Sequence, residues 1–111
     1  MSFNMLYPHY ILDENGEPVP EYDLHVWSKW FEEHDRRVAL DMVNGYRVST
    51  VFLSIDHNFG VEGKPILWET MIFGGSDGDE CYCERYSSLH DAQEGHKRIV
   101  EKLQSGELGL Y

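Results

Sequence analysis

The sequence predicts an α+β fold, a two-layer sandwich in which a four-stranded antiparallel meander sheet is flanked by two helices on one face. Two segments with apolar residues at helical spacing, one in each half of the chain, favour this class. Between them, an Asn-Gly pair separates two strand-like runs, and two more such runs follow. The length of 111 residues fits a single domain, 1–111, with an extended lead-in and turn over 1–20 and a tail over 106–111.

The first helix is expected directly after the lead-in. In "YPHYILDENGEPVP", a short apolar strand precedes a turn over residues 13–16 and an extended proline-rich stretch. Asp23 is a good N-cap, because its carboxylate can accept hydrogen bonds from free backbone N–H groups. The apolar stripe of the helix consists of Leu24, Trp27, Trp30, Phe31 and His34. Trp27 and Phe31 are its expected anchors.

The runs on either side of Asn44-Gly45 predict the register and the faces of the sheet. This pair is typical of a two-residue type I′ hairpin. The predicted cross-strand pairs are Val43 with Tyr46, Asp41 with Val48, Leu40 with Ser49, and Val38 with Val51. Strand side chains alternate between faces. We therefore assign one face to the core beneath both helices, formed by Val38, Leu40, Met42, Val51, Leu53 and Ile55. The opposite face carries Asp41, Val43, Tyr46, Val48, Thr50 and Phe52.

Two more strands and a second helix complete the predicted fold. The strands are "ILWETMIFGG" and "CYCERYSS", separated by an acidic, glycine-rich turn. Ser88 and Asp91 resemble a capping box at the start of the helix, and Gly106 is expected to end it. Gly95 is expected to let the helix lie close to the sheet. The apolar stripe consists of Leu89, Ala92, His96, Ile99, Val100 and Leu103, in which His96 is expected to be a hydrogen-bonded core residue.

Composition restricts the classes of partner. The net charge is −11, from 20 acidic and 9 basic residues. Such a surface repels nucleic acid and anionic membranes, so we expect neither as a partner, whereas a protein partner or a second copy is compatible. The chain contains no apolar stretch of about 18 residues and no signal-peptide pattern at its start, so we expect a cytoplasmic protein. Cys81 and Cys83 are expected to be reduced thiols.

Four residues are the candidates for catalysis: Asp56, His57, Glu69 and Glu84. If the strand through Ile55 continues, Asp56 and His57 point to opposite faces; if it ends there, they can converge. Three carboxylates close together repel each other unless a hard cation joins them. Such a cluster would bind Mg²⁺ or Ca²⁺ in a small metal-dependent hydrolase. No recognised catalytic or metal-binding motif is present, so we expect no cofactor and no metal site, and enzyme activity stays open.

The face without helices is the predicted binding surface. Its apolar residues are Val43, Tyr46, Val48 and Phe52, joined by Leu67, Met71 and Phe73 if the third strand follows the register. A patch of this kind on a monomer marks a partner surface, for docking to another protein or for a homodimer. In the alternative, the N-terminal segment with Tyr7, Tyr10 and Ile11, or the C-terminal residues 108–111, fold over this face.

Several long strings resemble a family of small proteins encoded by bacteriophages and prophages. They are "ILDENGEPVPEYDLHVWSKWFE", "RVSTVFLSIDHNFG", "LWETMIFGG" and "ERYSS", and they cover roughly residues 10–100. The resemblance implies a bacteriophage or prophage origin more than a particular activity, so it assigns no catalytic residue. We expect a small acidic phage accessory protein that binds a host factor or defence protein. The alternatives are the metal-dependent hydrolase and a virion or assembly component.

Overall fold

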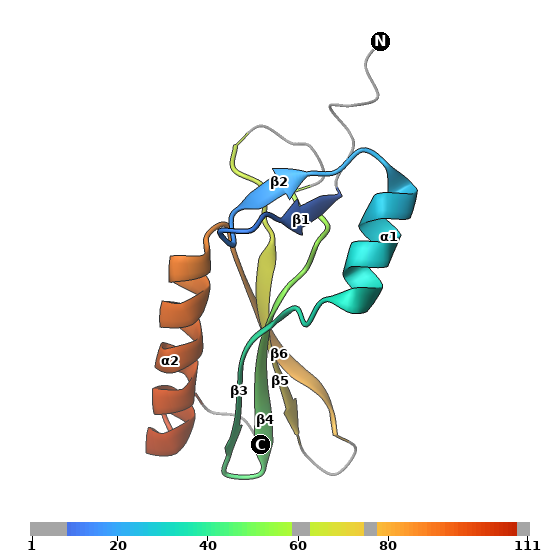
Figure 1. The fold of residues 1–111 in the computed structure, drawn as a ribbon. Coiled ribbons are helices and arrows are strands. Elements are labelled where there is room, and N and C mark those ends of the chain that lie inside the picture. Colours follow the sequence, from blue (N-terminus) through green and yellow to red (C-terminus); the bar gives the residue numbers. More distant parts are fainter. Residues whose placement is uncertain (1–8, 59–62, 75–77, 109–111) are drawn as a thin grey trace.

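The computed structural model describes residues 9–58, 63–74 and 78–108 (Figure 1). The elements of these residues are β1 (Tyr10–Leu12), β2 (Pro18–Pro20), α1 (Leu24–Glu33), β3 (Arg37–Val43), β4 (Tyr46–Phe52), β5 (Trp68–Gly74), β6 (Asp79–Tyr86) and α2 (Leu89–Ser105). Strands β3 to β6 form a four-stranded antiparallel sheet in chain order, which confirms the α+β class and the meander. The predicted short strand, turn and extended proline-rich stretch are present, and in addition β1 and β2 pair as a hairpin that forms a second, two-stranded sheet.

The turn at Asn44-Gly45 joins β3 to β4 as predicted. Asn44 and Gly45 have φ angles of 52° and 84°, and a type I′ turn requires positive values at both positions. The confirmed pairs are Val43 with Tyr46, Asp41 with Val48, and Leu40 with Ser49. The predicted pairing of Val38 with Val51 is wrong. A β-bulge at this end of β3 places Arg37 opposite Val51 instead.

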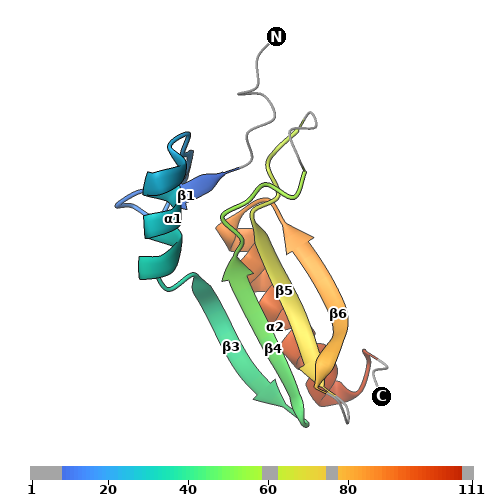
Figure 2. The same cartoon turned by 90° about the vertical axis from the view of Figure 1, so that its right-hand side faces the viewer.

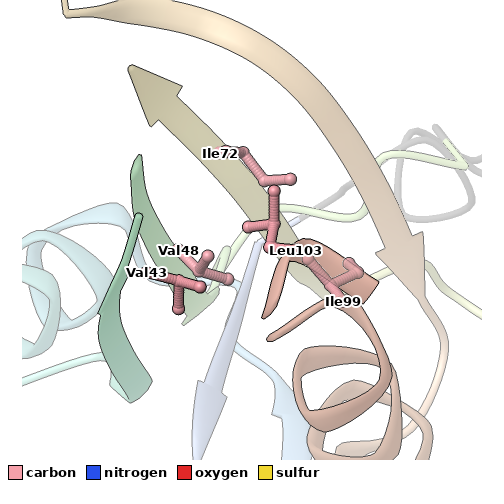
Figure 3. Close-up of a cluster of buried hydrophobic side chains, with 5 residues drawn as sticks. All are labelled: Val43, Val48, Ile72, Ile99 and Leu103. Atoms are coloured by element: carbon pink, nitrogen blue, oxygen red, sulfur yellow. The ribbon is translucent and has the colours of Figure 1, made fainter. Parts of the chain in front are cut away.

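Helix α2 lies along one side of the sheet, which we call the covered face (Figures 1 and 2). The register assigns to it Ala39, Asp41, Val43, Tyr46, Val48, Thr50, Phe52, Trp68, Thr70, Ile72, Tyr82, Glu84 and Tyr86. Ile99 and Leu103 of α2 belong to one cluster with Val48 and Ile72 (Figure 3). Val48, Ile72 and Ile99 are all 0% exposed, so this cluster is the centre of the core between helix and sheet.

The predicted assignment of the two sheet faces is wrong. We expected the helices over Val38, Leu40, Met42, Val51, Leu53 and Ile55, but α2 covers the opposite face. Leu40 and Met42 are 41% and 69% exposed, whereas Val43 is 6% exposed. The cause lies in the distribution of charge, since the face of Leu40 carries Arg37, Arg47, Glu69, Glu80 and Arg85, whereas the covered face carries Asp41 and Glu84. Burying a charged side chain costs more free energy than burying an apolar side chain gains. The helix therefore covers the less charged face.

Gly95 brings α2 close to β6, as expected from the sequence. A Cβ atom at this position would lie 2.4 Å from Cε1 of Tyr86, so only glycine fits without movement of the helix or the ring. The predicted ends of the helix are also confirmed. The side chain of Ser88 accepts a hydrogen bond from the N–H of Asp91, and Gly106 follows the last turn in the left-handed conformation, with φ 80°.

Helix α1 lies at one end of the molecule beside β1 and does not join α2 over the sheet (Figure 2). The expectation of two helices side by side on one face is therefore wrong. Asp23 caps α1, as predicted. Trp30 packs edge-to-face on Phe52, with ring centroids 5.8 Å apart, and Nε1 of Trp27 donates a hydrogen bond to the carbonyl of Ser54 at 3.1 Å. These two tryptophans anchor α1 to the end of the covered face.

The alternation of side chains along β4 ends near Ser54. The strand itself ends at Phe52, and Ser54 has a φ of 67°, which is uncommon for a residue with a side chain. Its buried hydroxyl donates to the carbonyl of Tyr10 at 2.8 Å, and the N–H of Tyr10 donates back to the Ser54 carbonyl at 2.9 Å. Leu53 and Ile55 therefore do not continue a sheet face. Instead, the chain turns here to bind the β1–β2 hairpin.

Candidate interaction surface

The four candidate catalytic residues do not meet at one point. Glu84 pairs in register with Thr70, the neighbour of Glu69, so the two glutamates lie on opposite faces of the sheet. Each has its own cation, since Glu69 forms an ion pair with Arg85 and Glu84 forms one with Arg98. Residues 9–58, 63–74 and 78–108 contain no cluster of three or more histidine, cysteine or acidic side chains that could hold a metal ion.

Asp56 and His57 belong to a loop and not to a strand. Asp56 is 6% exposed, and its Oδ1 accepts hydrogen bonds from the N–H groups of Asn58, at 2.7 Å, and of Ile66, at 2.8 Å. Nδ1 of His57 lies 3.0 Å from the carbonyl oxygen of Ile55. The Asp56 carboxylate thus joins the two ends of the segment between β4 and β5, which gives this residue a structural role.

A chain of hydrogen bonds crosses the interface between α2 and the sheet. It runs through Asp41, His96, Thr50, Thr70 and Tyr86. Nε2 of His96 donates to Oδ2 of Asp41 at 2.7 Å, and its Nδ1 hydrogen-bonds with Oγ1 of Thr50 at 2.7 Å. If Nδ1 is assigned as the acceptor, every hydroxyl in the chain donates to the next group toward His96. This assignment satisfies the buried imidazole, as the sequence led us to expect for His96.

The order acid, imidazole and hydroxyl resembles a catalytic arrangement, but burial argues against catalysis. Thr50 and Thr70 are both 0% exposed, and His96 is 5% exposed. A nucleophile must reach its substrate, and the near-complete burial of these three side chains prevents this. We therefore assign this polar chain to holding α2 in position.

The side of the sheet opposite α2, which we call the open face, is arranged in three rows across the strands. The rows are Arg37–Val51–Glu69–Arg85, Leu40–Ser49–Met71–Cys83 and Met42–Arg47–Phe73–Glu80. Figure 2 views the sheet from this side, and no helix or strand of the described chain lies over it. In the middle row, Leu40 is exposed and Ser49, Met71 and Cys83 are half-buried. Apolar side chains such as Leu40 and Met71 are unusual on the solvated face of a sheet, where polar residues are normally found.

Two contacts organise the charged groups of the open face. The guanidinium of Arg47 lies over the ring of Phe73, 4.5 Å from its centroid. Oε2 of the buried Glu69 accepts from Nε of Arg85 at 2.8 Å and from Sγ of Cys83 at 3.1 Å. Burial, together with the hydrogen bond to Glu69, raises the pKa of the Cys83 thiol to about 11. Cys83 is therefore a protonated hydrogen-bond donor near neutral pH and a poor nucleophile.

The structure divides the predicted binding residues between the two faces. Val43, Tyr46, Val48 and Phe52 lie on the covered face and pack in the core, so they are not available to a partner. Leu67, which precedes β5, is 0% exposed in the cluster around Phe52 and is not available either. Met71 and Phe73 lie on the open face and are half-buried. Leu40 and Met42 also lie on the open face, although their sequence pattern had predicted both in the core. The alternate positions Val38, Leu40 and Met42 of β3 had indicated one apolar face of the strand, but that face was assigned to the core.

The alternative in which the chain ends cover the face of Val48 is partly correct. Tyr10 packs against the cluster around Phe52, and Leu108 packs against the cluster around Val48. Both segments add to the cover that α2 provides. Tyr7 and residues 109–111 lie outside the described residues.

Comparisons with models of protein families, with curated proteins and with solved structures gave no match. The resemblance to phage-encoded proteins therefore stays a prediction. Within the described residues, no helix has both the length and the apolar character needed to cross a membrane.

Proposed function

We propose that this chain is a small acidic accessory protein of bacteriophage or prophage origin that acts by binding another protein through its open face. The observation that carries the proposal is the exposure of Leu40 and Met42, 41% and 69%, on a sheet face over which no described element lies. In an antiparallel sheet with one solvated face, the outward positions are normally polar. Exposed apolar side chains grouped on one face favour a partner surface.

The charge of the chain supports a protein as the partner. A net charge of −11 opposes contact with nucleic acid and with anionic lipids. The resemblance to phage-encoded proteins favours a bacterial host factor, such as a defence protein, met in the cytoplasm of the host. A second copy of this chain is the other candidate occupant, since a homodimer would cover the same apolar side chains.

Affinity capture from a bacterial lysate tests this proposal when three baits are compared. The first is the unmodified chain, and the second carries Leu40→Glu and Met42→Glu on the open face. The third carries Gln93→Glu and Gln104→Glu at exposed positions of α2, which gives the same change in charge away from the open face. We expect captured proteins to be retained by the first and third baits and lost by the second.

Folding of each bait is checked by circular dichroism and by its urea midpoint, which should be similar for all three. If the unmodified chain and the open-face variant capture the same proteins equally well, the open face is not the binding surface. Sedimentation velocity of the same three proteins detects the homodimer, which the open-face variant should dissociate. Higher oligomers unaffected by these substitutions would favour an assembly component instead.

A further inference from the structure

The chain of hydrogen bonds that begins at Asp41 has a second carboxylate at its other end. Its last hydroxyl, that of Tyr86, donates to Oγ1 of Thr70 at 3.0 Å. Glu84 lies two residues away on the same face of β6. Burial raises the pKa of Tyr86 to about 12, and the charge of Glu84 and a hydrogen bond with it add to the rise. The Tyr86 hydroxyl therefore keeps its proton near neutral pH and has two acceptors within reach, Thr70 and Glu84.

With a neutral imidazole, the hydroxyl groups of the chain all donate toward His96. Nδ1 accepts from Thr50, Thr50 accepts from Thr70, and Tyr86 donates to Thr70. Nε2 carries the remaining proton of the ring and donates to Asp41. Each donor of the chain thus has an acceptor, and the carboxylate at the far end is not required as one.

The same groups can form the chain in the opposite direction when the imidazole is protonated. A proton added from solvent to the neutral ring occupies Nδ1, which must then donate to Thr50. Thr50 can donate to Thr70, and Thr70 to Tyr86, because a hydroxyl group both donates and accepts and its hydrogen can rotate. The Tyr86 hydroxyl then donates to Glu84. One proton has been added, no hydroxyl has been ionised, and every polar group of the chain keeps a partner.

The charged side chains that the sheet presents to α2 are carboxylates. Along the described part of the covered face they are Asp41 on β3 and Glu84 on β6, and β4 and β5 add none. The other titratable side chains of this face are Tyr46, Tyr82 and Tyr86. Oδ2 of Asp41 lies 2.7 Å from Nε2 of the imidazole. A protonated ring therefore has an opposite charge in direct contact, which offsets part of the cost of burying it.

Helix α2 adds a cation only at the far end of the chain. Arg98 forms an ion pair with Glu84, and the hydroxyl of Tyr82 donates to the same carboxylate at 3.0 Å. A carboxylate has two oxygens and about four acceptor sites, so a further hydrogen bond from Tyr86 can be accepted. Beside the imidazole, the residues three and four positions away on the helix are uncharged; they are Ala92, Gln93, Ile99 and Val100.

We infer that the polar chain is reversible, so that His96 can take up a proton while α2 stays docked on the sheet and the Tyr86 hydroxyl turns from Thr70 to Glu84. A buried histidine that becomes charged without partners weakens a fold. Here, each direction of the chain pairs every one of its polar groups. The core thereby tolerates the pH range in which histidine changes its charge. This property belongs to the covered face and is independent of the proposed function.

Nuclear magnetic resonance of the unmodified chain between about pH 8 and pH 5, with labelled histidine and tyrosine rings, tests the inference. The imidazole nitrogens of His96 report its protonation, and Cζ of Tyr86 reports the acceptor of its hydroxyl. We expect hydrogen on Nε2 alone at high pH, on both nitrogens at low pH, and a Tyr86 signal that shifts with the same midpoint as His96. Tyr82, which donates to Glu84 outside the chain, is the internal control and should shift less than half as much.

Two variants separate transmission along the chain from the direct effect of a nearby charge. Thr50→Val interrupts the chain, so the Tyr86 signal should no longer follow His96, whereas Thr50→Ser keeps the hydroxyl and should restore the response. Glu84→Gln keeps the shape of the last acceptor but removes its charge, and it should at least halve the shift of Tyr86. This second variant changes a partly exposed side chain, so it provides the test even if Thr50→Val does not fold.

The inference is overturned if the His96 ring keeps one protonation state over the whole range, or if Tyr86 does not respond while the ring becomes protonated. A Tyr86 response that persists unchanged in Thr50→Val or in Glu84→Gln would reveal a through-space effect and overturn it as well. Loss of the contacts between Ile99 and Val48 at the midpoint of His96 would show that protonation releases α2, which is the opposite of the expected result.

Discussion

The two faces of the four-stranded sheet are built from the same four strands but have different environments. On the covered face, Val48 and Ile72 are 0% exposed beneath α2, and Thr50 is held in a chain of hydrogen bonds. On the open face, Leu40 and Met42 are exposed, and charged side chains flank them. Apolar side chains on a strand therefore do not show by themselves which face is the core. The charges contributed by the neighbouring strands decide which face is buried.

The largest expected difference between the faces is at Ile72 and Met71, adjacent residues of β5. Ile72→Ala leaves a cavity in the centre of the core and should lower the free energy of unfolding by about 2–5 kcal/mol. Met71→Ala removes a half-buried side chain from the open face and should cost less than about 1 kcal/mol. Urea unfolding followed by circular dichroism measures both values. Equal losses for the two variants would contradict the assignment of the faces.

A smaller effect is expected where α2 lies closest to the covered face. In Gly95→Ala, the added Cβ would lie 2.4 Å from the ring of Tyr86, so the helix or the ring must move. We expect a destabilisation of about 1–3 kcal/mol from overpacking, although alanine favours helix by about 1 kcal/mol over glycine. Glu94→Ala, at the exposed neighbouring position, is the control and should be close to neutral. A stabilised Gly95→Ala protein would show that the helix is farther from β6.

The polar chain in the core offers a further test, again with neighbouring residues on opposite faces. Thr50→Val keeps the shape of the side chain but removes the hydroxyl that joins His96 to Thr70, and it leaves buried polar groups without a partner. The expected cost is about 1–3 kcal/mol. Ser49→Ala, on the open face, should change the free energy of unfolding by less than about 0.5 kcal/mol. A neutral Thr50→Val variant would mean that the polar chain does not hold α2.

The smallest expected effect concerns the reactivity of a thiol on the open face. In a Cys81→Ser variant, Cys83 is the remaining cysteine. Because its pKa is about 11, only a small fraction of the thiol is converted to reactive thiolate at pH values well below 11. At pH 8 about one thiol in a thousand is ionised, so the rate of alkylation by iodoacetamide should rise about tenfold per pH unit up to pH 10. A rate that levels off near pH 8.5 would contradict the buried contact with Glu69.

Local signals in the sequence predicted the local structure well. Asn44-Gly45 gave the turn and most of the register between β3 and β4, because two positive φ angles leave few alternatives. Asp23, Ser88 and Gly106 marked the ends of the helices through backbone hydrogen bonds that depend on neighbouring residues only. These features could be predicted because the interacting groups are close in the chain.

The choice of the covered face could not be predicted in the same way. The connection from β4 to β5 is long and has no two-residue turn, so the sequence does not determine whether Met71 or Ile72 shares a face with Val48. An uncovered sheet face was one of two predicted alternatives. Met71 and Phe73 were assigned to it correctly, but the residues of β3 and β4 were assigned to the wrong faces. Likewise, the position of His96 predicted a core histidine, but its contact with Thr50 depends on how α2 docks, which is a long-range property.

Nuclear Overhauser contacts between methyl groups test the central claim most directly, namely that α2 covers the face of Val48 and Ile72 and leaves that of Leu40 and Met71 open. In protein with labelled methyl groups, we predict contacts from Ile99 and Leu103 to Val48 and Ile72. Contacts from these two α2 residues to Leu40 or Met71, without those to Val48 and Ile72, would contradict the account.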